Sequence, residues 1–182
     1  DTNTLTKELN PGVMERDLAQ RNTTYKVNDE GVITLMQKKF GYNIEFVFDR
    51  EFEFAEQEDE PQDEQNQEEE GDEGKYAFHN ITITLTKPGH GSLRLGGQLH
   101  LNSDLKLQTF TPYQENGTEL RTVSTEDLSD AALNSIFDAL EVVCLSDQDC
   151  GAIIEVARQE RLKTHLQSLD FMTTFFETTE TH

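Results

Sequence analysis

The sequence predicts an α+β domain in which an antiparallel sheet comes first and helices follow. Between about residue 25 and residue 113, apolar and polar side chains alternate, which is the period of strands with one buried face. After Ser124 the apolar spacing changes to three and four residues, the period of amphipathic helices. A strongly acidic segment interrupts the strand-forming half. The length of 182 residues is that of a single domain, residues 1–182, with a modest core.

The N-terminal residues predict a short or broken helix. Leu5, Leu9 and Val13 are four residues apart, which suits a helix, but the Pro11-Gly12 pair is expected to interrupt it.

The first strands are separated by turn sequences. Tyr25 and Val27 precede a turn at residues 28–31, and a second strand is expected over residues 32–40, ending at Gly41. A third strand should have one apolar and one acidic face. Its apolar face holds Ile44, Phe46, Phe48, Phe52 and Phe54, and its acidic face holds Glu45, Asp49, Glu51 and Glu53.

Later strands show a change of face. Tyr76 and Phe78 share one parity whereas Ile81, Ile83 and Leu85 share the other, which predicts a bulge near His79-Asn80. A turn at residues 88–91 leads to another alternating stretch, in which Gly96-Gly97 marks a bend or a close approach. The last long strand is expected to place Leu105, Leu107, Thr109, Thr111 and Tyr113 on one face.

Two helices are expected at the C-terminal end. Ser124 or Thr125 can cap the first, whose apolar stripe is Leu133, Phe137, Leu140 and Cys144. Ser146 or Asp147 can cap a second helix of about 30 residues. Its expected stripe is Ile154, Leu162, Leu166, Leu169, Met172 and Phe176. This helix is longer than one small domain face needs, which suggests packing across subunits.

The acidic segment is the sequence feature most informative about function. Residues 51–73 hold thirteen carboxylates and no Lys or Arg. Such a segment cannot bury enough apolar surface to offset the entropy of ordering it, so residues 55–74 are expected to be disordered. It is either a solvated linker or a functional loop, since long loops inside domains tend to be functional.

The overall charge selects the kind of partner. With 36 acidic residues against 15 basic ones, the formal net charge is −21. Direct nucleic-acid binding is not expected, because phosphate neutralisation needs clustered Lys and Arg. Basic proteins are the expected partners. The candidate partner-binding residues are Glu45, Asp49, Glu51, Glu53, Glu68, Glu69, Glu70, Asp72 and Glu73.

No catalytic, metal or cofactor motif is found, and the chain is predicted not to be an enzyme. The five histidines lack metal-ligand spacing, and no phosphate loop or nucleophile elbow is present. Residues 147–151 resemble the start of a calcium loop but lack its later ligands, so a helix cap is favoured there. Cys144 and Cys150 are close enough in sequence to form a disulfide, but two free thiols in a reducing compartment are favoured. No apolar run reaches transmembrane length, and the start at Asp1 suggests a mature form.

Three stretches carry a resemblance to a known family. They are residues 35–39 leading into residues 44–48, residues 122–128, and Gln159-Glu160 together with Leu169, Phe171 and Phe175. With the order of elements and the acidity, they make the chain similar to the mitochondrial acidic matrix protein family. That family includes the mitochondrial glycoprotein-like proteins and the globular-head complement receptor, or hyaluronan-binding protein. The chain looks most like a divergent member from a unicellular eukaryote.

The resemblance implies a strongly twisted sheet of about seven antiparallel strands, flanked by one N-terminal and two C-terminal helices. It also implies a doughnut-shaped homotrimer of the mitochondrial matrix, with uneven surface charge and no cofactor. Its implied role is that of an adaptor or chaperone for a basic RNA-binding protein, acting on mitochondrial RNA processing or editing. The chain departs from the best-known animal members in lacking Trp and in its Pro11-Gly12 pair.

Two other classes of function fit the acidity. One is a divalent-cation buffer, since carboxylates are hard oxygen ligands suited to calcium. The other is a histone chaperone, in which the acidic segment would cover basic histone surfaces.

Overall fold

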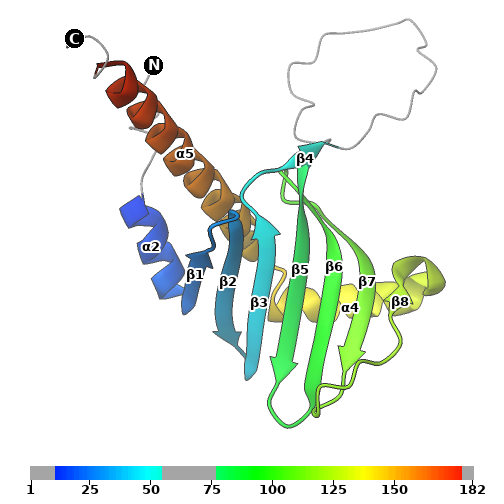
Figure 1. The fold of residues 1–182 in the computed structure, drawn as a ribbon. Helices are drawn as coiled ribbons and strands as arrows, with labels where there is room; N and C mark the ends of the chain where they lie inside the picture. Colours follow the sequence, from blue (N-terminus) through cyan, green and yellow to red (C-terminus); the bar gives the residue numbers. More distant parts are fainter. Residues whose placement is uncertain (1–10, 55–76, 178–182) are drawn as a thin grey trace, which may run out of the picture.

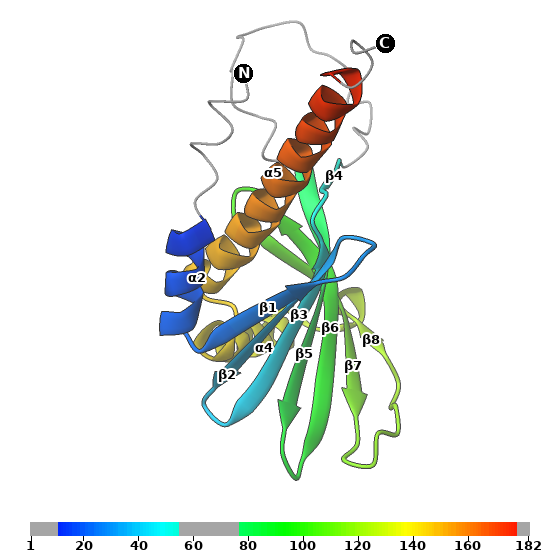
Figure 2. The same cartoon turned by 60° about the vertical axis from the view of Figure 1, so that its left-hand side comes forward.

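The computed structural model of the protein describes residues 11–54 and 77–177. Within these residues, one antiparallel sheet carries helices on a single face, as Figures 1 and 2 show. The helical elements are α2 (Pro11–Gln20), the 3-10 turn η1 (Thr125–Asp127), α4 (Asp130–Val143) and α5 (Asp147–Glu177). The strands are β1 (Thr23–Val27), β2 (Val32–Lys39), β3 (Tyr42–Asp49), β4 (Glu53–Phe54), β5 (Ala77–Lys87), β6 (Gly91–His100), β7 (Leu105–Tyr113) and β8 (Val123–Ser124).

The sheet is a meander in which neighbours in sequence are neighbours in space. Its order is β1-β2-β3-β5-β6-β7-β8, with the short β4 paired to β5 outside this path. Every pairing is antiparallel, and the strand direction turns steadily from β1 to β7 (Figure 2). The expected α+β class is therefore confirmed, with two of the eight strands only two residues long.

The core lies between the sheet and the helices. Alternate strand residues such as Phe46, Ile83 and Leu95 are almost wholly buried. They belong to one apolar cluster with Leu140 of α4 and Val156 of α5. Met14 and Leu18 of α2 and Ile153 of α5 belong to the same cluster. The helices thus cover one face, and Figure 1 looks onto the other, which no described helix covers.

The expected turns form as predicted. The Asn28 side-chain oxygen accepts hydrogen bonds from the amides of Glu30 (3.1 Å) and Val32 (2.9 Å), closing the β1–β2 hairpin. Phe40 and Gly41 both have positive φ, 52° and 81°, the geometry of a two-residue hairpin turn.

The described part of the N-terminal helix begins at the Pro11-Gly12 pair, and the predicted break before that pair falls outside the described residues and stays a prediction. Pro11 is the first residue of α2, and the helix runs on without interruption to Gln20. Proline fits the first helical turn because the amide it lacks would have no helical partner there. Leu5 and Leu9 lie outside the described residues.

The expected irregularity near His79-Asn80 is present on one edge of β5 only. Phe48 pairs with Ile81 and Glu53 with Phe78, so four residues stand opposite these two. On the other edge β5 pairs with β6 with no shift of register.

A second shift falls between Gly96 and Gly97, which pair with Thr109 and Leu107 of β7. Gln108 is left over, so the face of β7 changes there. Phe110 rather than Thr109 or Thr111 continues the apolar face of Leu107 into the core cluster.

The glycine pair marks a close approach, as expected. A Cβ on Gly97 would lie 2.5 Å from the carbonyl oxygen of Lys106, which leaves no room for a side chain.

The third strand ends earlier than its alternation predicts. β3 stops at Asp49, the chain bends at Arg50 and Glu51, and β4 then pairs with β5. Phe54 is therefore exposed rather than part of the core, and Phe52 is half-buried.

The helix starts are also corrected. The Ser124 hydroxyl accepts from the Glu126 amide and caps only the 3-10 turn, whereas Ser129 caps α4 five residues later. α5 begins beside Ser146 as expected, and the Ser146 hydroxyl accepts from the Asp149 amide (3.3 Å).

The buried stripe of α5 differs from the predicted one. Cys150, Ile153, Val156 and Ala157 are buried, whereas Ile154 is only partly buried. Leu162, Leu166 and Leu169 are partly buried, and Met172 and Phe176 are exposed. The C-terminal part of the helix extends past the sheet (Figure 1).

Candidate partner-binding surfaces

Glu45 and Asp49 lie exposed on β3, on the face that no described helix covers. Glu45 stands between Met36 of β2 and Thr84 of β5 in the sheet register. Directly opposed residues of an antiparallel pair point to the same face, so this row of side chains crosses the sheet together.

Basic residues share this face. Arg94 lies opposite Thr84, and Lys38 lies opposite Asn43, two positions before Glu45. Lys26 and Lys106 stand on the same side by their pairing with Thr34 and Gln98. All four basic side chains are exposed. The face that carries Glu45 and Asp49 is therefore of mixed charge, and their role in partner binding stays a prediction.

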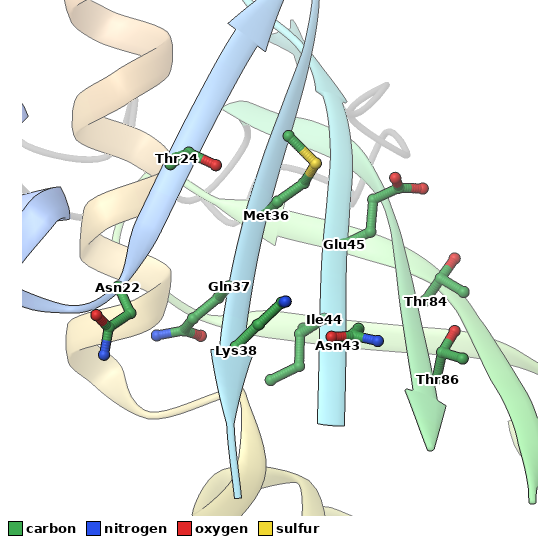
Figure 3. A pocket seen from close by; sticks show the side chains of 10 residues that line it. All are labelled: Asn22, Thr24, Met36, Gln37, Lys38, Asn43, Ile44, Glu45, Thr84 and Thr86. Carbon is green, nitrogen blue, oxygen red and sulfur yellow. The ribbon is translucent and has the colours of Figure 1, made fainter. Parts of the chain in front are cut away.

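A shallow hollow of about 820 Å³ lies on this face. Figure 3 shows the side chains that line it on β1, β2, β3 and β5, with Met36, Glu45 and Thr84 on neighbouring strands. Hydroxyl, amide and single charged groups surround it, namely Thr24, Lys38, Asn43, Glu45, Thr84 and Thr86. Met36 and Ile44 add apolar surface between these polar groups, so the hollow has a mixed polar and apolar lining.

Glu51 and Glu53 lie at the start of the acidic segment, apart from Glu45. Glu51 is exposed and lies 3.6 Å from Nε of Arg50, whose Nη1 donates to the Thr164 hydroxyl of α5 (3.0 Å). The Arg161 guanidinium of α5 lies over the Phe52 ring, 4.4 Å from its centre. These contacts fasten the chain to α5 just before it enters the segment. The other candidates, Glu68, Glu69, Glu70, Asp72 and Glu73, lie outside the described residues.

His79 is part of the same fastening. It is buried against Phe48 and Phe52, and its Nδ1 lies 3.1 Å from the carbonyl oxygen of Glu51, which can only accept. Burial lowers the pKa of His79, and the nearby Arg161 charge lowers it further, against the raising effect of the Glu51 and Asp49 backbone carbonyls. The side chain is thus a neutral structural hydrogen-bond donor.

A second acidic surface, within the described residues, was not among the predicted sites. Between Thr122 and Ala157 the sequence has eight carboxylates and no Lys, Arg or His. Six of these are exposed, on η1, α4 and the start of α5: Glu126, Asp127, Asp130, Asp138, Glu141 and Asp147. The signal in the sequence is the run of acidic residues without a basic one, which is less dense than the run at residues 51–73.

Of the two carboxylates of this run that are not exposed, Glu155 is partly buried and Asp149 is buried. Its Oδ2 accepts from the Ser146 hydroxyl (2.6 Å) and lies 3.3 Å from Nζ of Lys39. This confirms the expected helix cap at residues 147–151. Among the described residues, no group of three or more His, Cys, Asp or Glu side chains is arranged to hold a metal ion.

The two cysteines are free and buried, as expected. Burial raises the pKa of the Cys144 thiol to about 12 and that of Cys150 to about 11, with the nearby Asp149 carboxylate adding to both shifts. Protonated, buried thiols of this kind are inert.

No protein-family model matches the sequence, and no curated protein sequence matches it. Fourteen chains of solved structures do match. One is a Leishmania major protein of unknown function that is a sequence homologue of human p32, with a TM-score of 0.57 at 13% identity. The alignment covers 90% of this chain and 96% of the Leishmania major chain. Another is the Trypanosoma brucei p22 protein, with a TM-score of 0.59 at 12% identity, covering 96% of this chain and 95% of its own.

At these identities the likeness establishes a shared fold over nearly the whole chain. Both matched proteins come from unicellular eukaryotes, and one is a p32 homologue, as the resemblance in the sequence predicted. Among the described residues, no helix has the length and apolarity needed to cross a membrane.

Proposed function

We propose that the chain is a member of the mitochondrial acidic matrix protein family and acts as a non-enzymatic acidic adaptor, or chaperone, for a basic protein. The observation that carries this proposal is the p32-like fold over at least 90% of the chain, combined with a net charge of −21. The most fitting client is an RNA-binding protein of the mitochondrial matrix.

The mechanism is electrostatic attraction followed by competition. The exposed acids of η1 and α4, with those of residues 51–73, raise the rate at which a basic client meets the adaptor. The client residues that bind these carboxylates are of the kind that would otherwise bind RNA phosphates. Adaptor binding therefore alters how much client is available to RNA, which is a route to control RNA processing or editing.

The assembly we propose is a homotrimer. Phe171, Met172, Phe175 and Phe176 of α5 are each between 46% and 70% exposed. Large apolar side chains gathered on one exposed helix end mark an interaction surface. A second copy of the chain is the partner that the resemblance implies for them.

The test uses the full chain and a labelled peptide of Arg-Gly-Gly repeats, with a matched peptide in which Gln replaces every Arg. The Arg peptide is expected to bind, and its affinity to fall steeply between about 0.05 and 0.2 M salt. Neutralising Glu68, Glu69, Glu70, Asp72 and Glu73 together should slow association more than it speeds dissociation. Equal binding of both peptides, or binding insensitive to salt, would contradict the proposal. Imaging of the full-length precursor tests the compartment.

A further inference from the structure

An apolar groove of about 450 Å³ lies between α4 and the end of the sheet where the β5–β6 hairpin turns. In Figure 1, α4 crosses behind this part of the sheet. Leu93 of β6 pairs with Leu85 of β5 and with Pro112 of β7, so these three lining residues share the helix-covered side. Ala139 and Val143 of α4 line the groove from the other side. Its volume and mainly apolar lining are those of a small-molecule site.

The charge along the groove is opposite in sign to that of the chain. Lys87 and His90 line it, and no carboxylate is among the described residues that do, although the chain has 36 acids and 15 bases. Within residues 11–54 and 77–177, no carboxylate forms an ion pair with Lys87. The groove therefore combines apolar walls with a cation that an added anion can pair with.

Tyr42 determines where the Lys87 charge stands. Nζ of Lys87 lies 5.6 Å from the centre of the Tyr42 ring, and Tyr42 also lines the groove. The attraction between a cation and an aromatic face holds the ammonium group at this rim. Tyr113 lines the groove as well, and its hydroxyl donates to Glu119 (2.8 Å), a carboxylate outside the lining.

The two chemistries lie at different places in the groove, which orients an occupant. Lys87 and His90 stand at the β5–β6 turn. The α4 wall lies next to the exposed acids Asp138 and Glu141, which are outside the lining. An anionic group is therefore favoured at the turn and an apolar chain toward α4. A basic group would be repelled at the turn, and a wholly polar anion would leave the apolar walls in water.

We propose that this groove binds a fatty-acid anion, with its acyl chain along Leu93, Leu120 and Val143 and its carboxylate beside Lys87 and His90. Leu120 of the loop before β8 is 44% exposed, and the acyl chain would cover it. This is a ligand site in addition to the acidic surfaces assigned to a basic client, and it does not depend on that assignment.

The first experiment compares decanoate with 1-decanol, the neutral alcohol of the same chain length, on the full chain. Calorimetry should show one decanoate bound per chain, and decanol bound about fivefold more weakly because it lacks the charge. Methyl NMR signals of Leu93, Leu120 and Val143 should shift with decanoate, whereas those of Leu162 on α5 should not. Absence of binding, equal affinity for the two ligands, or shifts confined to other methyl groups would overturn the proposal.

Two substitutions separate the walls from the charge. Ala139→Gln fills the groove from an exposed position on α4 and should weaken both ligands about tenfold; Ala131→Gln, two turns away on the same helix and outside the lining, is its control. Lys87→Gln should lower the affinity for decanoate to that for decanol and leave decanol unchanged. Lys26→Gln, exposed on β1, is the matched control. Decanoate binding that survives both Ala139→Gln and Lys87→Gln would place the ligand elsewhere.

Other occupants of the groove give different results. If a second copy of the chain fills it, the Leu93, Leu120 and Val143 signals change with protein concentration and not with decanoate. If it takes an acidic protein segment, a peptide of alternating Leu and Glu shifts these signals and decanoate does not. Either result overturns the fatty-acid site, and the wild-type spectra decide this even where a variant fails to fold. Binding of the Arg peptide should be the same with and without Ala139→Gln, so failure of this site leaves the adaptor role standing.

Discussion

Asp149 joins the helices to the sheet through contacts from three directions. Ser146 donates to it from the α4–α5 junction, and Lys39 and Gln37 reach it from β2. Cys144 and Cys150 flank this junction and are buried. Because the Asp149 carboxylate pairs with Lys39 and caps α5, its oxygens are already engaged within the chain. The role of Asp149 is therefore structural.

The cysteines give a direct prediction at this scale. With thiol pKa values of about 12 and about 11, Cys144 and Cys150 remain protonated at mildly alkaline pH. Iodoacetamide at about pH 8 should therefore leave both unmodified in the native protein and modify both in urea. Mass spectrometry of the intact chain measures this. Rapid labelling of either thiol in the native state would contradict the burial.

His79 predicts a pH dependence of stability. Its folded pKa lies below the ordinary value of 6.5, so the unfolded chain binds the proton more readily. The stability that the neutral form provides is complete above about pH 6.5 and declines as the pH falls below it. The groups facing the ring are the carbonyls of Glu51 and Asp49 and the cation of Arg161.

His79→Gln removes this titration. The gap in melting temperature between the wild type and His79→Gln should be wider at about pH 8 than at about pH 5.5. Asn80→Gln, exposed at the next position of β5, is the control: it changes no titratable group, so its gap should not vary with pH. A constant gap for His79→Gln would show that the ring is not buried in its neutral form.

At the scale of elements, β4 explains how the fold tolerates its acidic segment. Phe54 pairs directly with Ala77, so the chain leaves the sheet and returns to it at one place. The strand pairings on both sides of this place are made by residues 11–54 and 77–177.

Replacement of residues 55–76 by a short Gly-Asn turn should therefore preserve cooperative unfolding. The free energy of unfolding should be unchanged or slightly higher, because a run of like charges is removed. Urea titration followed by circular dichroism measures both. Loss of a single cooperative transition would show that the segment is structural.

Two acidic pairs test which surface attracts the client. Asp138→Asn with Glu141→Gln on α4, and Glu45→Gln with Asp49→Asn on β3, each remove two exposed charges. The α4 pair should slow association of the Arg peptide more, because Lys38 and Arg94 already offset the field around β3. Stopped-flow fluorescence measures the two rates. Equal slowing by both pairs, or greater slowing by the β3 pair, would show that the client binds the mixed-charge face of the sheet.

Local pattern was enough to predict most elements, because strand alternation and turn residues act over a few positions. It failed where two patterns compete. Leu107, Thr109 and Thr111 alternate in the sequence and so were predicted to share a face. The extra residue Gln108 shifts the alternation, and Leu107 and Phe110 share the buried face instead. The site depended on register too. In the sequence, Glu45 alternates with other acidic residues. In the sheet, it pairs with Thr84 of β5, and Thr84 pairs with Arg94 of β6, so a basic residue lies in the same row across the strands.

At the scale of the whole molecule, the two faces of the sheet differ in burial and in charge. The helix-covered side contains the core and presents the acids of α4, whereas the opposite side carries mixed polar groups. This segregation gives one chain an uneven charge distribution. The sequence resemblance implies the same property for the assembled ring.

The oligomeric state is the last prediction. Phe171 and Met172 near the end of α5 are exposed large apolar side chains, of the kind that mark an interaction surface. Light scattering at micromolar concentration should give about three times the chain mass of 20.8 kDa. Because only folded chains associate, association stabilises the folded state and the melting temperature should rise with protein concentration. The control is Phe171→Ser with Phe175→Ser, which should give a smaller particle whose melting temperature does not change with concentration. A wild-type chain that remains at 20.8 kDa would show that this surface serves the client instead.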